Sequence, residues 1–168
     1  TTLDLRAQEA AQKAVRSGLE KLESSVAAIK KLKEKGKNLE ALLISSDPSS
    51  GFITSIVGGR SYVATQYNRA VESRRQVGSV MKPFVYLAAL ESKDPDGEPY
   101  KATTEIDDHT LTLKYEGQSW TTKNYDGKFR GMIPLWYGLV ESLNSATARL
   151  GSTVGIKNVI DVARKLGI

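Results

Sequence analysis

A hairpin signal constrains the fold of this chain more than any other feature. The segment LEALLISSD at 39–47 is largely apolar, and the segment FITSIVGG at 52–59 is rich in β-branched residues and ends in two glycines. The residues between them, DPSSG at 47–51, combine proline, serine and glycine, which is typical of a turn. Because so short a turn can join only antiparallel strands, the sequence predicts a β-hairpin.

A long helical pattern precedes the hairpin. In residues 4–35 apolar residues recur at three- and four-residue steps, which is typical of an amphipathic helix. Asp4 is a suitable capping residue and Gly36 a suitable stop. Gly18 and the serine pair at 24–25 weaken the pattern, so the helix can break into two at either place.

Further helical patterns follow the hairpin. Helices are predicted over 79–92, over 133–155 with a break near ESLNS, and over 156–168. The segment 101–131 has the pattern of an irregular polar stretch of short strands and turns. The last helix has an apolar set that is expected to face inward: Ile156, Val159, Ile160, Ala163 and Leu166.

The residue types present exclude several kinds of chemistry. The chain of 168 residues suits one domain, has no cysteine and has a single histidine, His109. Disulfides and thiolate metal sites are therefore excluded, and no set of side chains points to a metal site or a cofactor. A Ser-His-Asp type of catalysis could rest only on His109, so a nucleophile in this chain needs another base. The longest apolar run, at 83–90, is far shorter than the roughly 18 residues of a membrane-spanning helix.

The positive charge of the chain is concentrated in one place. The net charge is +5, and the run KKLKEKGK at 30–37 carries much of the excess. One interpretation is a contact with an acidic polymer or with membrane headgroups. The favoured interpretation is a solvated helix end, since lysines complement the negative end of the helix dipole. No aromatic residues interleave with this run, so nucleic-acid binding is not expected.

The stretch RQVGSVMKPF at 75–84 is the first candidate for chemistry. If a helix begins at Ser79, Gly78 allows a tight approach before it and Pro83 fits its first turn. Ser79 and Lys82 then lie one turn apart on one face, with about 5–6 Å between their Cβ atoms. The helix start can stabilise an oxyanion, and a partly desolvated lysine can act as the base for a serine. The alternative is a serine helix cap followed by an exposed lysine, which is the more common meaning of this pair alone.

The stretch Ser142-Leu143-Asn144 is the second candidate. It lies at the predicted break between two apolar helices, where a hydroxyl and an amide can project into a cleft. Taken alone it is equally well interpreted as a helix cap before SATARLG. The occurrence of both motifs in this order favours chemistry over two unrelated caps.

Together these stretches resemble a known family, the class A, bifunctional penicillin-binding proteins. Ser-x-x-Lys and Ser-x-Asn are motifs of penicillin-binding proteins and serine β-lactamases. The opening TTLDLRAQEAAQKAV resembles the linker helix that begins their transpeptidase domain. The segment from LLISSD to YLAALE is similar to their first hairpin and active-site helix, and WTTKNYDG onward resembles the stretch that carries their second motif.

The resemblance implies a fold and a division of the chain. The fold is α+β, a part of the penicillin-binding, serine β-lactamase-like transpeptidase fold, with antiparallel strands, flanking helices and a helical lobe. Residues 1–38 would be a linker-like helical segment that packs on the domain. Residues 39–168 would be the N-terminal part of a transpeptidase domain.

The resemblance also implies a role for each motif residue. Ser79 corresponds to the acylated nucleophile and Lys82 to its proton acceptor. Ser142 corresponds to the serine that relays protons to and from the leaving amine, and Asn144 to the amide that orients the substrate peptide and holds Lys82. The reaction implied is acyl transfer: Ser79 attacks a D-Ala-D-Ala stem peptide of peptidoglycan, and an amine of a neighbouring stem resolves the acyl-enzyme into a cross-link. β-Lactams would acylate the same serine.

Two departures from the family pattern limit these expectations. Valine stands at position 77, where the family usually has proline, and Lys-Ser/Thr-Gly, the third motif, does not occur; KLG at 165–167 belongs to a predicted helix. The third motif is expected in a C-terminal half of the domain, on the same protein or on a second chain. The family's glycosyltransferase domain and membrane anchor are likewise expected in a parent protein. We therefore expect the chain of 168 residues to be inactive by itself.

Two alternatives remain beside the transpeptidase. One is a D,D-carboxypeptidase or β-lactamase-like hydrolase that uses water in the second step. The other is a non-catalytic scaffold or β-lactam-binding module that keeps the fold. The expected location, from the resemblance alone, is the outer face of the bacterial cytoplasmic membrane.

Overall fold

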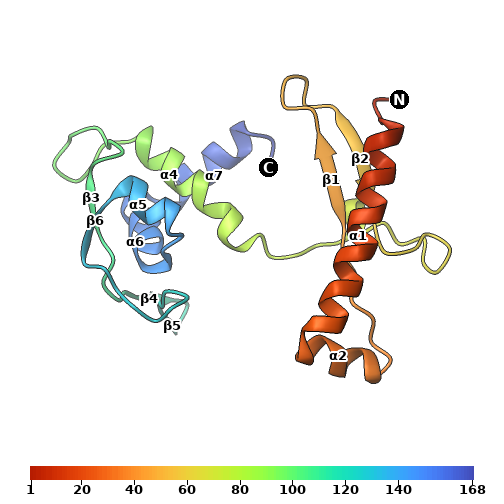
Figure 1. Ribbon diagram of the computed structural model, residues 1–168. Helices are drawn as coiled ribbons and strands as arrows, with labels where there is room; N and C mark the ends of the chain where they lie inside the picture. The colour runs from red at the N-terminus through yellow and green to blue at the C-terminus, as the bar shows by residue number, and fades with distance from the viewer. The chain divides into compact units, whose positions relative to one another are not determined.

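The computed structural model describes the backbone of residues 1–168 and every side chain except that of Tyr115. The chain divides into two compact units, residues 1–75 and residues 76–168, called unit 1 and unit 2 below. Unit 1 runs from red to yellow in Figure 1, and unit 2 from green to blue. The predicted boundary at 38/39 concerns the family's domain organisation and stays a prediction.

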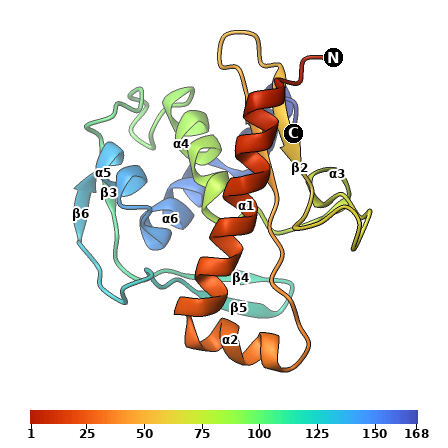
Figure 2. The ribbon, with the colours of Figure 1, turned by 45° about the vertical axis from the view of Figure 1, so that its right-hand side comes forward.

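Unit 1 contains the predicted long helix and hairpin. Its elements are α1 (Leu5–Ser25), α2 (Ala27–Glu34), β1 (Leu43–Ser46), β2 (Ile53–Val57) and the single turn α3 (Arg69–Glu72). β1 and β2 pair antiparallel, as predicted, with an irregularity between Ser45 and Ser46. α1 lies along this hairpin (Figure 2) and buries a small apolar core against it, formed by Ala11, Val15, Leu19 and Val57.

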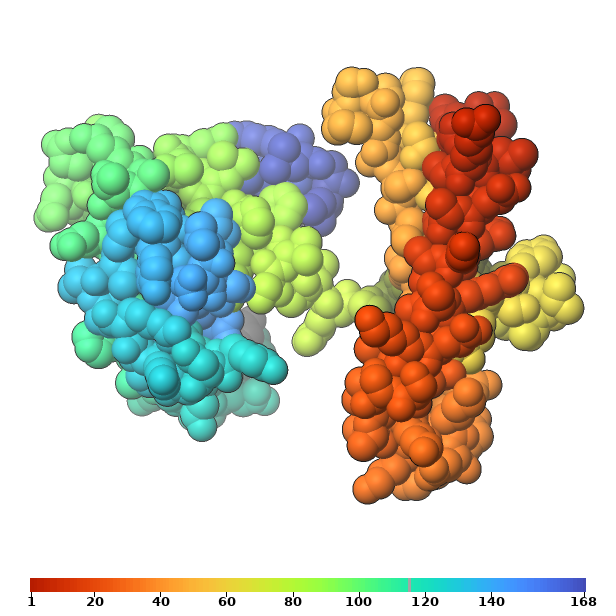
Figure 3. Space-filling view, viewed as in Figure 1, coloured from red at the N-terminus to blue at the C-terminus, as the bar shows by residue number. Residues whose placement is uncertain are grey.

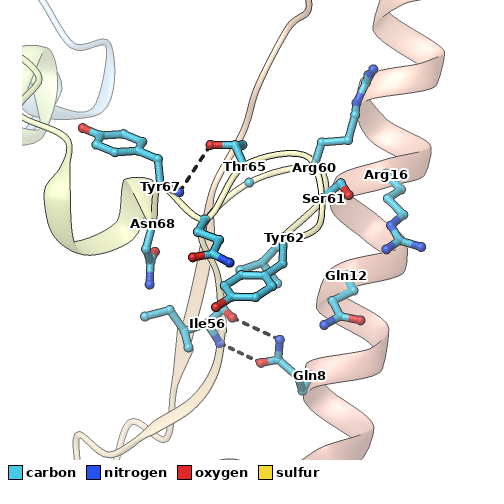
Figure 4. Close-up of a pocket in the computed structure, with 14 residues that line it drawn as sticks. Gln8, Gln12, Arg16, Ile56, Arg60, Ser61, Tyr62, Thr65, Tyr67 and Asn68 are labelled. Carbon is cyan, nitrogen blue, oxygen red and sulfur yellow. Dashed lines mark hydrogen bonds between the residues drawn. The ribbon is translucent and has the colours of Figure 1, made fainter.

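Local chemistry explains where α1 begins and ends. The Asp4 carboxylate accepts a hydrogen bond from the Ala7 N–H, so Asp4 caps the helix as predicted. The helix breaks at Val26, whose backbone is extended, directly after the serine pair at 24–25. The Gln8 side chain both accepts from the Ile56 N–H (2.9 Å) and donates to the Ile56 carbonyl (3.0 Å), as Figure 4 shows. The amide of Gln8 thus satisfies backbone groups of β2 as a neighbouring strand would.

Unit 2 is a helical cluster with two small antiparallel ladders. Its helices are η1 (Gly78–Met81, a 3₁₀ turn), α4 (Lys82–Leu90), α5 (Leu135–Val140), α6 (Asn144–Val154) and α7 (Ile156–Lys165). β3 (Glu105–Asp107) pairs with β6 (Met132–Pro134), and β4 (Thr112–Tyr115) pairs with β5 (Gln118–Thr121). α4 packs against both α6 and α7, and Figure 3 shows the light-green start and the violet-blue end of this unit side by side. Its core includes Tyr86, Leu135, Ala146, Leu150, Val159 and Val162.

Two details of unit 2 differ from the sequence prediction. The helix predicted from 133 begins at Leu135, because Ile133 and Pro134 complete strand β6. In α7 the buried residues are Val159, Val162 and Ala163. The inward position predicted for three others is wrong, since they are exposed: Ile156, Ile160 and Leu166. The packing of α7 on α4 and α6 covers a narrower face than the apolar pattern suggests.

No helix of the described residues combines the length and the apolar character that crossing a membrane requires.

Candidate active site

Ser79 and Lys82 lie on the first turns of the predicted active-site helix. Gly78 has φ +56°, a left-handed conformation that glycine adopts without steric cost, and the 3₁₀ turn η1 starts there. The Lys82 N–H donates to the Ser79 carbonyl, and α4 continues from Lys82 with Pro83 in its first turn. Residues three apart in a 3₁₀ turn lie above one another, so Ser79 and Lys82 face the same side. Ser79 is the N-cap residue of neither η1 nor α4, which argues against its interpretation as a helix cap.

The Ser142 turn joins α5 to α6 through a strained backbone. Ser142 has φ +53°, which costs a residue with a side chain on the order of 1–3 kcal/mol. Two backbone hydrogen bonds tie the turn to the end of α5. The Ser142 N–H donates to the Leu139 carbonyl (3.0 Å), and the Leu143 N–H donates to the Gly138 carbonyl (2.9 Å). The N-cap of α6 is Leu143, which supplies no capping side chain. The interpretation of this motif as a local helix cap is therefore wrong.

Lys82 connects the helix to the turn. Its Nζ donates to the Ser142 carbonyl, to Ser142 Oγ (3.0 Å) and to Asn144 Oδ1 (2.7 Å). These acceptors use all three N–H groups of an ammonium. The amide of Asn144 is oriented in turn, since its Nδ2 donates to the Lys123 carbonyl (2.9 Å). Three of the four predicted site residues thus form one hydrogen-bonded set.

Burial changes the acid–base behaviour of Lys82. The side chain is buried, with only 8% of its surface exposed. Loss of hydration lowers the pKa of Lys82 below its usual value. The three oxygens that bind Nζ favour the ammonium form, but they belong to neutral groups and carry only partial charge. The lowered pKa makes the neutral amine, the form that accepts a proton, more accessible near neutral pH.

A cleft of about 690 Å³ opens above this set within unit 2. Ser79, Lys82 and Asn144 supply polar groups to its wall. The Ser79 side chain is exposed, and none of the hydrogen bonds among the described residues joins it to Lys82. Hydrogen bonds of this kind in active sites often tighten only when substrate is bound. Gln76 and Thr147 also line the cleft, and most of the remaining wall is apolar, including Met81, Val85, Leu113, Trp120 and Ile156.

The other candidates for chemistry do not reach this cleft. His109 is mostly exposed and its Nδ1 lies 2.5 Å from Asp107 Oδ1, away from the residues that line the cleft. Among the described residues there is no group of three or more His, Cys, Asp or Glu that could hold a metal ion. A polar hollow of about 310 Å³ in unit 1, drawn in Figure 4, contains none of the predicted site residues.

Several residues of this region were not predicted as functional. Leu113 and Trp120, which lie opposite each other in the β4–β5 ladder, were assigned only to short strands. Asp108 and Asn124, which bind backbone amides at the start of α6, were assigned to an irregular polar stretch. No local sequence signal marks Asp108 and Asn124, because the start of α6 after Leu143 is apparent only in the structure.

Comparison with known proteins identifies the family of the chain. The family model "Penicillin binding protein transpeptidase domain" matches residues 41–168, most of the chain. The chain belongs to the penicillin-binding protein transpeptidase family. Penicillin-binding protein 1B of Vibrio cholerae is 43% identical over 137 residues, which cover 81% of this chain and 17% of that protein. Penicillin-binding protein 1B of Haemophilus influenzae is 33% identical over 168 residues, covering 99% of this chain and 20% of that protein.

Solved structures of penicillin-binding proteins resemble the chain as well. The crystal structure of penicillin-binding protein 1A from Haemophilus influenzae gives a TM-score of 0.69 at 32% identity, over 77% of this chain and 19% of that one. PonA1 of Mycobacterium tuberculosis in complex with penicillin V gives 0.69 at 26% identity, over all of this chain and 38% of that one. The chain spans about a fifth of the length of the curated relatives. The resemblance to penicillin-binding proteins and the partial α+β transpeptidase fold are thereby confirmed.

The valine that departs from the family pattern fits the observed backbone. Val77 has φ −68°. This value lies within the range to which a proline ring is limited, so a penicillin-binding protein with proline here can share the same local geometry. Valine at position 77 is therefore compatible with the same backbone conformation just before Ser79.

The strain at Ser142 gives a test that combines stability and labelling. Ser142→Gly and Ser142→Ala both remove the hydroxyl, but only glycine relieves the left-handed backbone. We expect the glycine variant to have a free energy of unfolding about 1 kcal/mol higher than the alanine variant. Both are expected to react more slowly with a fluorescent penicillin than the parent protein. Denaturant unfolding measures the first difference, and equal stability of the two variants would contradict the strain at Ser142.

Proposed function

We propose that this chain supplies the acylating part of a peptidoglycan D,D-transpeptidase, with Ser79 as nucleophile and Lys82 as its base. The observation that carries the proposal is the hydrogen bonding of Lys82 to Ser142 and Asn144, in the cleft that Ser79 also lines. Ser79 and the desolvated Lys82 line one cleft, and Ser142 Oγ is hydrogen-bonded to Lys82, so these three groups can provide a proton pathway without a histidine. The substrate would be a stem peptide that ends in D-Ala-D-Ala.

The first half-reaction breaks one amide bond and forms one ester. Ser79 Oγ attacks the carbonyl carbon of the penultimate D-alanine while its proton passes to neutral Lys82. The C–N bond to the terminal D-alanine then breaks, and the departing amine takes its proton from Lys82 through Ser142, whose Oγ lies 3.0 Å from Nζ. The positive end of the η1–α4 helix start favours the negative charge that develops on the carbonyl oxygen. Asn144 orients the peptide through its side-chain amide.

The second half-reaction distinguishes a transpeptidase from a hydrolase. The amine of a neighbouring stem attacks the ester carbonyl and passes a proton to Lys82. The C–O bond to Ser79 then breaks, Lys82 returns the proton to Ser79 Oγ, and an amide cross-link is left. Water in the same position would give a carboxypeptidase or β-lactamase-like hydrolase. Similarity to penicillin-binding proteins 1A and 1B supports transfer to an amine. The same similarity supports a glycosyltransferase domain in the parent protein, and action at the outer face of the cytoplasmic membrane.

Mass spectrometry of the intact gene product that contains residues 1–168 tests this proposal. The protein is incubated with a D-Ala-D-Ala stem peptide, with and without a second stem that carries a free amine. We expect release of D-alanine and formation of a peptide dimer that depends on the amine. Release of D-alanine without any dimer would support the hydrolase. If neither D-alanine nor dimer forms and penicillin gives no adduct, the non-catalytic module is supported.

The chain of 168 residues by itself is expected to form no cross-link. The sequence holds no Lys-Ser/Thr-Gly, so the part of the site that this motif supplies in the family has no counterpart in these residues. Dimer formation in the assay above, run with purified residues 1–168 alone, measures this. Robust turnover by that polypeptide would contradict the need for the third motif.

A further inference from the structure

A buried carboxylate and a buried amide lie behind the cleft and play no part in the acyl-transfer steps above. The Asp108 side chain is fully buried, and Asn124 is 5% exposed. Asn124 Nδ2 donates to both carboxylate oxygens of Asp108, at 3.1 and 2.8 Å, and also to the Lys128 carbonyl at 2.8 Å. The Arg130 N–H donates to Asp108 Oδ2 at 3.0 Å. A charge so deeply buried persists only where hydrogen bonds replace its hydration.

This pair caps α6 from a distance. The first N–H groups of a helix have no partner inside it, and Leu143 cannot supply one. The Asn124 carbonyl oxygen accepts from the Asn144 N–H (2.7 Å) and the Ser145 N–H (3.2 Å), and Asp108 Oδ1 accepts from the Ala146 N–H (3.2 Å). The negative charge of Asp108 also lies at the positive end of the helix dipole.

The first residue of α6 is itself a site residue. The Asn144 backbone is fixed by Asn124, and its side chain receives Lys82 at 2.7 Å. Two residues earlier, Ser142 presents its carbonyl and its hydroxyl to the same Nζ from a left-handed backbone. Backbone hydrogen bonds to α5 hold the N-terminal end of this turn. The hydrogen bonds of Asp108 and Asn124 hold its C-terminal end, where α6 begins.

We propose that Asp108 and Asn124 are a positioning pair that holds the Ser142–Asn144 turn in the position where its oxygens bind Lys82. The pair touches neither substrate nor Lys82, and it acts through the backbone of α6. Its effect on acylation rests on the function proposed above, whereas its effect on Lys82 does not. When the pair is broken, the start of α6 loosens, water reaches Nζ, and the neutral form of Lys82 becomes scarcer.

A direct electrostatic role for Asp108 would have the opposite sign. Removing a nearby negative charge destabilises an ammonium, so loss of the Asp108 charge alone would lower the pKa of Lys82. Loosening of the turn restores hydration to the ammonium and raises that pKa. Among the described residues that line the cleft, no side chain other than Lys82 carries a charge. The groups that bind its Nζ are neutral oxygens of Ser142 and Asn144. The direction of the shift therefore separates positioning from direct electrostatics.

The test uses Asp108→Asn in the intact gene product that contains residues 1–168. This change keeps the size of the side chain but places an NH₂ group among N–H donors. We expect acylation by a fluorescent penicillin to slow about 10- to 100-fold, as is typical when a catalytic group is misplaced. We also expect the pKa of Lys82, followed by ¹³C NMR of its labelled Cε, to rise.

Two controls isolate the positioning effect. Asp107→Asn changes the neighbouring carboxylate, which pairs with Arg149 and His109 outside the cleft, and should leave acylation within about twofold, as for most substitutions away from a site. Val159→Ala removes buried volume from α7 and lowers stability, but should leave the pKa of Lys82 unchanged.

Each outcome decides one of the two proposals. An Asp108→Asn variant that acylates at the parent rate, or in which the pKa of Lys82 stays or falls, overturns the positioning pair. An equal effect of Val159→Ala on rate and pKa overturns it as well, because general loosening would then be sufficient. A parent protein that takes no penicillin label refutes the proposed function, and the Lys82 titration still decides the positioning pair.

Discussion

Replacing Ser79 with alanine is expected to abolish covalent labelling of the intact gene product by a fluorescent penicillin. Ser79 is the exposed hydroxyl of the cleft, on the same side of the helix start as Lys82. Loss of the attacking oxygen removes the covalent step itself, so we expect labelling to slow by at least about 10³-fold. Gel fluorescence and intact-protein mass spectrometry measure the adduct.

The alanine variant should otherwise resemble the parent protein. Ser79 is exposed and occupies no cap position, so we expect the free energy of unfolding to change by less than about 0.5 kcal/mol. Ser152→Ala, which changes an exposed serine farther along α6, is the matched control and should label normally. A label that persists in Ser79→Ala, or that maps by peptide analysis outside residues 76–84, would assign the nucleophile to another residue.

Replacement of Lys82 is expected to produce the second largest loss. Lys82→Met removes the base and leaves the oxygens of Ser142 and Asn144 without their donor. Lys82→Arg keeps a positive charge, but a guanidinium does not release its proton at any pH of the assay. A positioned base contributes about 10² to 10⁴ in rate, and we expect both variants to lose that much in stopped-flow acylation.

The pH dependence separates a base from a structural cation. The pKa of Lys82 is lowered by burial, so the fraction of neutral amine rises with pH around a midpoint below the usual value for lysine. Acylation of the parent protein should therefore increase with pH through that midpoint. The same shift makes the folded state relatively more stable as pH rises from the folded pKa to the unfolded one. A parent rate that does not change with pH, or a Lys82→Arg variant of full activity, would rule out the role of base.

The sequence predicted the elements that carry the motifs because their signals are local. The hairpin followed from a turn of proline, serine and glycine between two apolar runs, and the capping role of Asp4 from its place before a periodic pattern. The break between α5 and α6 followed from the polar residues within an apolar stretch. The set formed by Lys82, Ser142 and Asn144 was expected only through the family resemblance, since spacing cannot show which distant segments meet.

What the sequence did not predict depends on tertiary contacts. Asp108 and Asn124 stand in a polar stretch that has no periodic pattern, and their partners are backbone amides, which every residue except proline offers. In α7 the apolar pattern includes Ile156 and Ile160, yet only the face toward α4 and α6 is covered. Periodicity shows that a helix has an apolar face, but the neighbours decide how much of it is buried.

The start of α6 also ties the formation of the cleft to the order in which unit 2 folds. A helix with a local capping residue can begin before distant parts of the chain arrive. The amides that open α6 have partners 20 to 38 residues upstream. Closing loops of that length costs conformational entropy before any hydrogen bond is gained. The turn that holds Lys82 therefore forms together with the tertiary fold.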